Sequence, residues 1–273
     1  MNNESGHWYT REGKAMHQVA KANGEMRDTT LADARKFDLL PSVSAFLRVR
    51  NNPSLQNYLE DSMLRAAFNC PPSGGEEYAD WKAAIKRMAG EPAKTARDLG
   101  TMVHGAIEKY YSEPLLYSPY DILVNDKAVS SDEFVKPVAE VISGLGLEVM
   151  HSEGIVVNNA HGYAGTADII FKTPDSYGVL DFKTCKTEEG KRKKPYNDHG
   201  MQIAAYIAAV WGGDFDYPIG PKCRGYNLYI STNEIGRVDV HEWSAEDLQS
   251  KWLSFVNHIE MWIMEKNYDP RRK

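Results

Sequence analysis

Three residues in the second half of the chain have the types and spacing of a hydrolytic centre. Asp168 ends the segment GTAD at 165–168, and Asp181 and Lys183 are separated by one apolar residue, Phe182. Alternate side chains of a strand share a face, so Asp181 and Lys183 should point the same way while Phe182 points into apolar packing. A hairpin between the two segments would bring Asp168 beside Asp181.

Such an arrangement indicates phosphodiester chemistry. Two carboxylates at one place repel each other unless a cation binds between them, and a hard divalent ion such as Mg²⁺ suits an oxygen-only environment. Lys183 can hold or activate a water and stabilise charge on a phosphate. Either piece alone is as readily an ordinary surface Asp or a surface Asp–Lys pair. Both pieces in order across a hairpin favour a functional site.

The periodicity of the flanking sequence predicts the elements that position these residues. Asn52 and Pro53 are expected to open a helix, and Ser244 to cap the last one. Residues 1–38 are polar and weakly periodic, so no structure is assigned to them. Helices are predicted over 53–69, 76–88, 92–112, 131–144, 199–211 and from 245 onward, and strands over 147–157, 163–172, 179–184, 226–231 and 238–243.

This order of elements predicts an α/β domain with a central mixed β-sheet flanked by helices, preceded by a helical region. Adjacent antiparallel strands with short turns argue against a doubly wound dinucleotide fold, and no phosphate-binding loop of the Walker or Rossmann kind is present. We expect residues 1–95 to form a largely helical N-terminal extension and residues 96–273 to form the core that carries the site.

Composition is ordinary for a soluble globular protein, with 42% hydrophobic and 11% aromatic residues. No apolar run approaches the roughly 20 residues that span a bilayer, and the first residues do not resemble a secretory signal. A cytoplasmic location and no membrane association are therefore expected. The net charge of −6 argues against a protein that coats nucleic acid indiscriminately, but it allows a local basic groove.

The three cysteines, Cys70, Cys185 and Cys223, are far apart and odd in number. That spacing favours isolated thiols over a disulfide framework. It also lacks the clustering of a zinc or iron–sulfur site, so no iron–sulfur cluster is expected.

Two further segments carry residue types that suit a metal site. His104 lies in the predicted helix between Gly100 and Glu108 and could supply an imidazole ligand, although a lone helical histidine is more often structural. Gly100 and Gly105 cost a helix of the order of 1 kcal/mol each relative to alanine, so they predict a close backbone approach.

Gln202 and Tyr206 are four residues apart and therefore share one helix face. Their amide and phenol could contact the site or a nucleic-acid backbone. Taken alone, they would be the polar edge of an amphipathic helix.

Five segments in this order resemble the RecB-like branch of the PD-(D/E)XK nuclease superfamily. They are Gly100 to His104, Glu153, Gly165 to Asp168, Asp181 to Lys183, and Gln202 to Tyr206. The resemblance covers about residues 100–206. The segment LPSVS at 40–44, with its following helix, also looks like phage exonucleases and the mitochondrial genome maintenance exonuclease.

The resemblance implies a PD-(D/E)XK nuclease core that binds Mg²⁺ or Mn²⁺. The ligands would be His104, Asp168, Asp181 and the backbone carbonyl of Phe182. Lys183 would position or activate the attacking water.

Three further residues receive roles from the same resemblance. Glu153 would be an outer ligand or would contact a ligand. Gln202 and Tyr206 would orient the scissile strand or the lysine.

DNA contacts are expected on the loop that follows the Asp181 strand. Its basic residues would clamp phosphates and make binding sensitive to salt, or the loop would simply be solvated and mobile. Ser42 and Ser44 join this set through the resemblance of their segment. The loop residues concerned are Lys186, Lys191, Arg192, Lys193 and Lys194.

The leading functional hypothesis is a metal-dependent DNA exonuclease that acts on ends or single strands in replication, recombination or repair. A replication or recombination protein would be its partner, and the host cytoplasm its location if a phage encodes the chain. The alternatives are a structure-specific endonuclease of the same fold, a non-catalytic DNA-binding module, and a hydrolase of small phosphoesters. No expected catalytic position is replaced, which disfavours the module, and the basic loop argues mildly for a polymer substrate.

Overall fold

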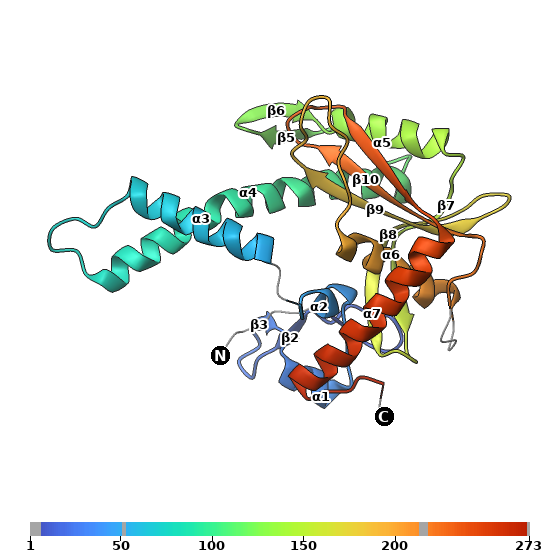
Figure 1. Cartoon of the computed structure of the whole chain (residues 1–273), viewed down its shortest axis with the longest axis horizontal. Helices are drawn as coiled ribbons and strands as arrows, with labels where there is room; N and C mark the ends of the chain where they lie inside the picture. Colours follow the sequence, from blue (N-terminus) through green and yellow to red (C-terminus); the bar gives the residue numbers. More distant parts are fainter. Residues whose placement is uncertain (1–6, 51–52, 213–217, 272–273) are drawn as a thin grey trace.

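A five-stranded mixed sheet forms the centre of the protein, whose computed structural model describes residues 7–50, 53–212 and 218–271. Its spatial order is β11-β10-β9-β8-β7 (Figure 1). β9 and β10 are parallel, whereas the other neighbours are antiparallel. The strands are β7 (Glu148–Asn158), β8 (Tyr163–Lys172), β9 (Tyr177–Cys185), β10 (Cys223–Ser231) and β11 (Val238–Trp243). The predicted α/β class with a mixed sheet is confirmed.

Two helical layers cover the sheet. α6 (Asn197–Trp211) makes the crossover that the parallel pair β9–β10 requires, and it packs with α7 (Ala245–Lys266) on one face. α4 (Tyr78–Ser112) and α5 (Asp132–Gly144) cover the other face, together with the hairpin of β5 (Asp121–Val124) and β6 (Lys127–Ser130) (Figure 1). Each layer encloses its own hydrophobic core against the sheet.

The alternation of β9 divides its side chains between these layers as the sequence predicts. Leu180 and Phe182 are buried in the core under α4 and α5. Asp181 and Lys183 point to the other face, where Lys183 contacts α6. The predicted cap of the last helix is also confirmed, because Ser244 and Asp247 form a reciprocal capping box at the start of α7.

Residues 7–50 form a small layer against α6 and α7. Its elements are β1 (Trp8–Tyr9), β2 (Gln18–Ala20), β3 (Met26–Asp28), α1 (Leu31–Phe37), β4 (Leu40–Pro41) and α2 (Val43–Leu47). Trp8 and Phe46 enter the same core as Trp262 of α7. The elements within residues 1–38 are two to seven residues long and too short to show a hydrophobic period, which is why the sequence assigns that stretch no structure.

The predicted break between helices 76–88 and 92–112 is wrong, because α4 is one helix of 35 residues that contains Pro92. Proline in a helix interior costs about 3 kcal/mol. Here the packing of α4 on α3 (Pro53–Asn69) at one end and on the sheet at the other keeps both halves in line, with Pro92 exposed to water.

The expected division at 95/96 falls inside α4 and stays a prediction. Asn52, the expected cap of α3, lies outside the described residues.

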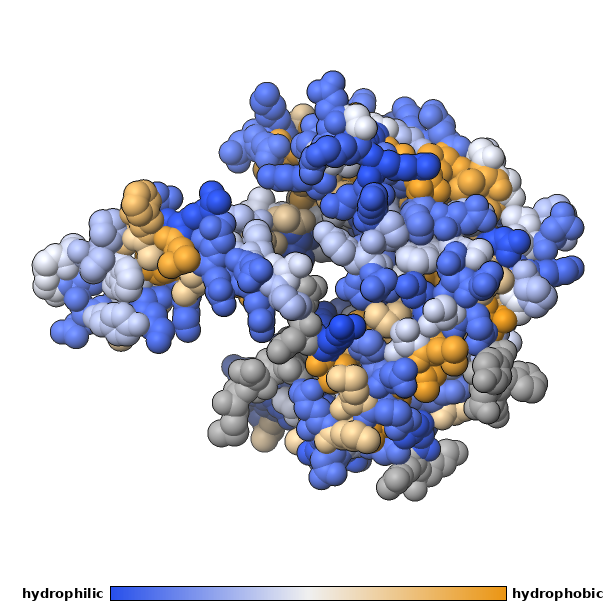
Figure 2. Space-filling model, in the orientation of Figure 1, coloured by the Kyte–Doolittle hydropathy of each residue, from blue (hydrophilic) through white to orange (hydrophobic). Residues whose placement is uncertain are grey.

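α3 and the first half of α4 form a hairpin that projects from the body (Figure 1). Trp81 Nε1 donates to the carbonyl of Cys70 at 2.8 Å and ties the turn between them. Hydrophobic side chains gather on this projection (Figure 2), where Leu64 and Phe68 are 70% and 87% exposed. Among the described residues, no helix is both long enough and apolar enough to cross a bilayer.

Candidate active site

The candidate site lies where β8 and β9 part. Their pairing runs from Lys172↔Tyr177 to Ile169↔Leu180 and then stops, just before Asp168 would pair with Asp181. Beyond that point the Asp168 side chain replaces the sheet's own bonding, because its Oδ2 accepts the backbone N–H of Phe182 at 2.7 Å. The two carboxylates therefore face each other across a gap in the sheet, as the hairpin argument predicts.

Lys183 connects Asp181 to helix α6. Its Nζ lies 2.5 Å from Asp181 Oδ2 and donates to Gln202 Oε1 at 3.1 Å. Gln202 Nε2 donates in turn to Tyr206 Oη at 3.1 Å. The predicted pair of Gln202 and Tyr206 on one helix face is confirmed, and its hydrogen bonds lead to the lysine.

His104 approaches the same gap from α4. Its Nδ1 is 3.8 Å from Asp168 Oδ2, and its ring makes an edge contact with Phe182. Burial lowers the pKa of His104, with Asp181 opposing and Lys183 assisting that shift, so the neutral imidazole that metals bind is favoured. The structure thus brings His104, Asp168, Asp181 and Lys183 together.

The glycines of α4 have different surroundings. A Cβ on Gly100 would lie 2.8 Å from Thr184 Oγ1, so the predicted close approach is confirmed there. A Cβ on Gly105 would meet nothing within 4 Å, so the same prediction is wrong for that residue.

Burial and the neighbouring charges shift the pKa values of Asp168 and Lys183. Burial, together with repulsion from Asp181, raises the pKa of Asp168 well above its ordinary value. For Lys183, burial alone would lower the pKa, but the carboxylates of Asp181 and Asp168 outweigh it and raise the pKa. Burial and repulsion thus act against the charged form of Asp168 despite the nearby ammonium group, and an added cation would favour that form.

Glu153 lies at an irregular point of β7, opposite Asp168. Its backbone is left-handed, with φ of +51°, close to a register shift between Val149 and His151. That conformation is uncommon for a residue with a Cβ and is typical of functional positions. Burial, Glu108 and Asp181 raise the pKa of Glu153 to about 7.

The predicted DNA-contacting loop connects the end of β9 to α6. Lys186, Lys191, Arg192 and Lys194 are exposed, and Lys193 is half-buried. The loop is anchored at its start by Thr187 N–H, which donates to Asn233 Oδ1 at 2.8 Å, and further on by Lys193 N–H, which donates to Asp239 Oδ2 at 2.8 Å.

The serines lie beside the strand that leads to Asp168. Ser42 is buried, forms a bridge to Ala164 of β8, and lies with its Oγ 3.0 Å from Ser44 Oγ. A contact of these residues with DNA stays a prediction.

Sequence reasoning missed several neighbours of the site. Asn227 and Trp243 form a hydrogen-bonded chain to Asp181. Glu108 acts on Glu153, and His199 Nδ1 lies 2.8 Å from Tyr229 Oη. The signals that could have found them were a lone amide inside the apolar strand 226–231 and a carboxylate four residues after His104 on the same helix.

Gly165 offers a test of how the site is packed. A Cβ there would lie 2.7 Å from Tyr206 Cε1, inside van der Waals contact. We expect Gly165→Ala to displace the ring, to destabilise the fold by about 1–3 kcal/mol, and to change the Gln202–Lys183 contacts. Gly105→Ala is the control and should stabilise α4 by about 1 kcal/mol. Thermal unfolding of both variants checks this, and a Gly165→Ala protein as stable as the wild type would contradict it.

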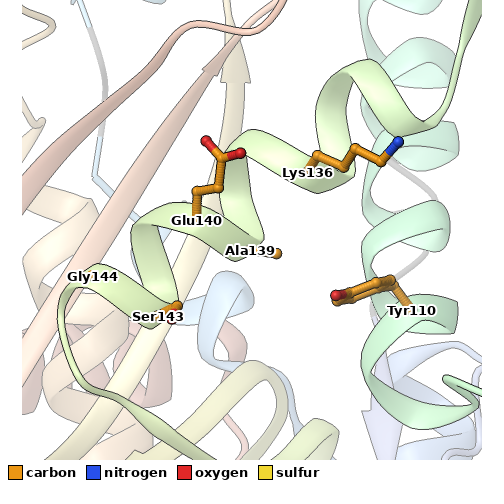
Figure 3. Close-up of a pocket in the computed structure, with 6 residues that line it drawn as sticks. All are labelled: Tyr110, Lys136, Ala139, Glu140, Ser143 and Gly144. Carbon is orange, nitrogen blue, oxygen red and sulfur yellow. The ribbon is translucent and has the colours of Figure 1, made fainter.

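A separate pocket lies between α4 and α5 (Figure 3). It is lined by Tyr110, Lys136, Ala139, Glu140, Ser143 and Gly144. None of the candidate site residues lines it, so it is not part of the centre described above.

Within residues 7–50, 53–212 and 218–271, no three His, Cys, Asp or Glu side chains form a ready group for a metal ion. Lys183 lies against Asp181, and His104 stands 3.8 Å from Asp168. The donor types nevertheless fit a hard divalent cation, because two carboxylates, one buried and one half-buried, and an imidazole with a lowered pKa meet at the gap.

Comparisons with known proteins assign no family. No family model matches the chain, and no curated protein matches it. One solved structure that was compared is described as "Crystal structure of SSO0001". It is 14% identical, with 80% of this chain and 89% of that chain covered, and the TM-score is 0.30. At that value the likeness carries no argument about fold family or function.

Proposed function

We propose that the protein is a metal-dependent DNA nuclease with a PD-(D/E)XK core of the RecB-like branch. The observation that carries this proposal is the gap between β8 and β9, where Asp168 and Asp181 face each other and Lys183 lies alongside. Two carboxylates and a lysine held at parted strands provide charge, a cation site and a group that handles water. Those are the requirements of phosphodiester hydrolysis.

Asp168, Asp181, His104 and the carbonyl of Phe182 would hold Mg²⁺ or Mn²⁺. Such an ion polarises a phosphoryl oxygen and lowers the pKa of water. Burial, and after it repulsion from Asp181, acts against the charged form of Asp168, so a cation that compensates this charge supports the assignment. A cation would also compete with Lys183 for Asp181 and free its ammonium group for the substrate.

The remaining residues bind and orient. Lys183, once partly released from Asp181, donates to the attacking water or to the phosphate. Gln202 accepts from Lys183 and Tyr206 accepts from Gln202, so these two side chains keep the ammonium directed at the gap. Glu153 lies close enough to Asp181 for that carboxylate to help raise the pKa of Glu153, which suits contact with a ligand rather than with the polymer.

Exonuclease action on DNA ends or single strands is the form of this activity that we favour. Residues of the N-terminal layer flank the strand leading to Asp168: Ser42 bridges Ala164, and Tyr9 Oη lies 3.2 Å from Thr166 Oγ1. The N-terminal layer on this side of β8 would restrict the approach of a duplex, which suits a single strand that enters by its end. An endonuclease would use the same residues with a more open path.

The test is incubation with end-labelled single-stranded, duplex and closed circular DNA, with Mg²⁺, Mn²⁺ or a chelator. Loss of label from linear DNA with metal, and intact circles, are expected. Cutting of closed circles would replace exonuclease by endonuclease. Metal-independent DNA binding without any cleavage would leave the non-catalytic module, and cleavage of small phosphoesters alone would indicate the hydrolase of small substrates.

The basic loop predicts a salt-dependent contribution to DNA binding. Replacing Lys186, Arg192 and Lys194 together by alanine should weaken single-stranded DNA binding. It should also reduce the slope of log K against log salt by about 0.7 for each phosphate that is no longer neutralised. Fluorescence anisotropy at several salt concentrations measures both. A matched triple variant at Lys127, Lys136 and Lys172, outside this loop, should keep the wild-type slope, and equal slopes in both variants would contradict the prediction.

A further inference from the structure

Asp181 has a second partner besides Lys183. Asn227 of β10 is fully buried, and its Nδ2 donates to Asp181 Oδ2 at 2.8 Å. The two residues are in register across the parallel pair β9–β10, which places their side chains on the same face of the sheet. The carboxylate is therefore held from β10 as well as from its own strand.

Trp243 fixes the orientation of this amide. Its indole Nε1 donates to Asn227 Oδ1 at 2.8 Å. An indole N–H can only donate, so the oxygen of Asn227 must face Trp243 and the NH₂ group must face Asp181. The reverse orientation would set two donors against each other at the indole and two acceptors at the carboxylate. Asp181 therefore accepts a hydrogen bond from the NH₂ group of Asn227.

Trp243 is itself held by the helical layer. A Cβ on Gly200 of α6 would lie 3.0 Å from the indole, so a larger residue there would have to displace the ring. Lys251 of α7 places its Nζ 5.5 Å from the ring centroid. The orientation of Asp181 is therefore set by packing of α6 and α7 as well as by neighbouring strands.

We propose that Asn227, oriented by Trp243, is a positioning residue that fixes the Asp181 carboxylate for cation binding. This inference rests on the proposed function. A carboxylate has about four lone-pair sites. Asn227 and Lys183 both contact Oδ2 of Asp181, and Lys183 also contacts Oδ1, so Oδ1 is the oxygen with room for a cation. Without the Asn227 amide, the carboxylate turns toward Lys183 and the cation loses a prepared ligand.

The experiment compares Asn227→Ala with Asn158→Ala. Asn158 is also a buried, hydrogen-bonded asparagine, but its partners are Tyr163 and His161, outside the site. Mn²⁺ binding is titrated by electron paramagnetic resonance without DNA, and kcat and KM for DNA are measured separately. Asn227→Ala should weaken Mn²⁺ binding about 10- to 100-fold and lower kcat, with KM for DNA unchanged. Asn158→Ala should lose stability while keeping the wild-type Mn²⁺ affinity.

If Asn227→Ala does not fold, Trp243→Phe provides a second test of the same role. Phenylalanine preserves an aromatic ring on Gly200 but removes the N–H that orients the amide, so its Mn²⁺ affinity should fall between those of the wild type and Asn227→Ala. Mn²⁺ affinities in Asn227→Ala and Trp243→Phe equal to the wild type, alongside wild-type cleavage, would overturn the positioning role alone. A wild-type protein that neither binds Mn²⁺ nor cleaves DNA would overturn the proposed function and this inference with it.

Discussion

Lys183→Met is expected to reduce DNA cleavage by about 10²- to 10⁴-fold, the contribution typical of a positioned group that handles protons or charge in a transition state. The side chain is 27% exposed, and its ammonium lies between Asp181 and Gln202. Methionine retains most of the aliphatic stem and fills the same space, so the folded structure should persist. The measurement is the single-turnover rate at saturating DNA and Mg²⁺.

The same substitution separates chemistry from stability. Removing the ammonium group leaves Asn227 as the one remaining member of this pair of Asp181 partners. The free energy of unfolding should therefore fall by about 1–3 kcal/mol. Lys172→Met is the control, because Lys172 ends β8 in an exposed ion pair with Glu148. Lys172→Met should cleave DNA as the wild type does, because Lys172 lies outside the site. Its free energy of unfolding should change by only about 0–1 kcal/mol, the contribution of an exposed ion pair. A Lys183→Met protein with the wild-type rate would remove Lys183 from the chemistry.

Sequence periodicity predicted which side chains of β9 share a face of the sheet, but it did not predict where the pairing of β8 and β9 ends. The alternation of β9 was enough to place Asp181 and Lys183 together, opposite Leu180 and Phe182. The end of β8–β9 pairing at Ile169 depends on a bond from Asp168 to a backbone N–H, which no local pattern records. A strand pattern gives which side a residue faces, whereas the parting of two strands is a tertiary property.

Asn227 was missed for a related reason. It meets Asp181 only because α6 carries the chain across and returns it parallel to β9, 46 positions further along. The sequence predicts strands over 226–231 and 238–243, which pair with each other in the structure, and nothing in that pairing points to β9. The register of a parallel crossover is fixed by helix packing, here including the glycine contact of α6 with Trp243.

Asp168→Asn is expected to stabilise the metal-free protein while abolishing cleavage. Burial and repulsion from Asp181 both act against the charged form of Asp168, and the attraction of Lys183 is a smaller opposing effect. An amide carries no charge, and its oxygen can still accept the N–H of Phe182 that Asp168 now accepts. The gain in the free energy of unfolding should be of the order of 1–2 kcal/mol, as is common where function requires a strained site.

Divalent cations should reverse the order of stability. Wild-type protein at 100 times its Kd for Mn²⁺ would gain about 2.7 kcal/mol, whereas Asp168→Asn, lacking a ligand, should gain little. Thermal unfolding with chelator and with Mn²⁺ measures both effects, and Asp175→Asn, in the exposed β8–β9 turn, should follow the wild type in each. If Asp168→Asn is less stable in chelator and gains as much from Mn²⁺ as the wild type, Asp168 holds no cation. Crossing stabilities would instead mean that the carboxylate pair is maintained at a cost to the fold because it serves the ion.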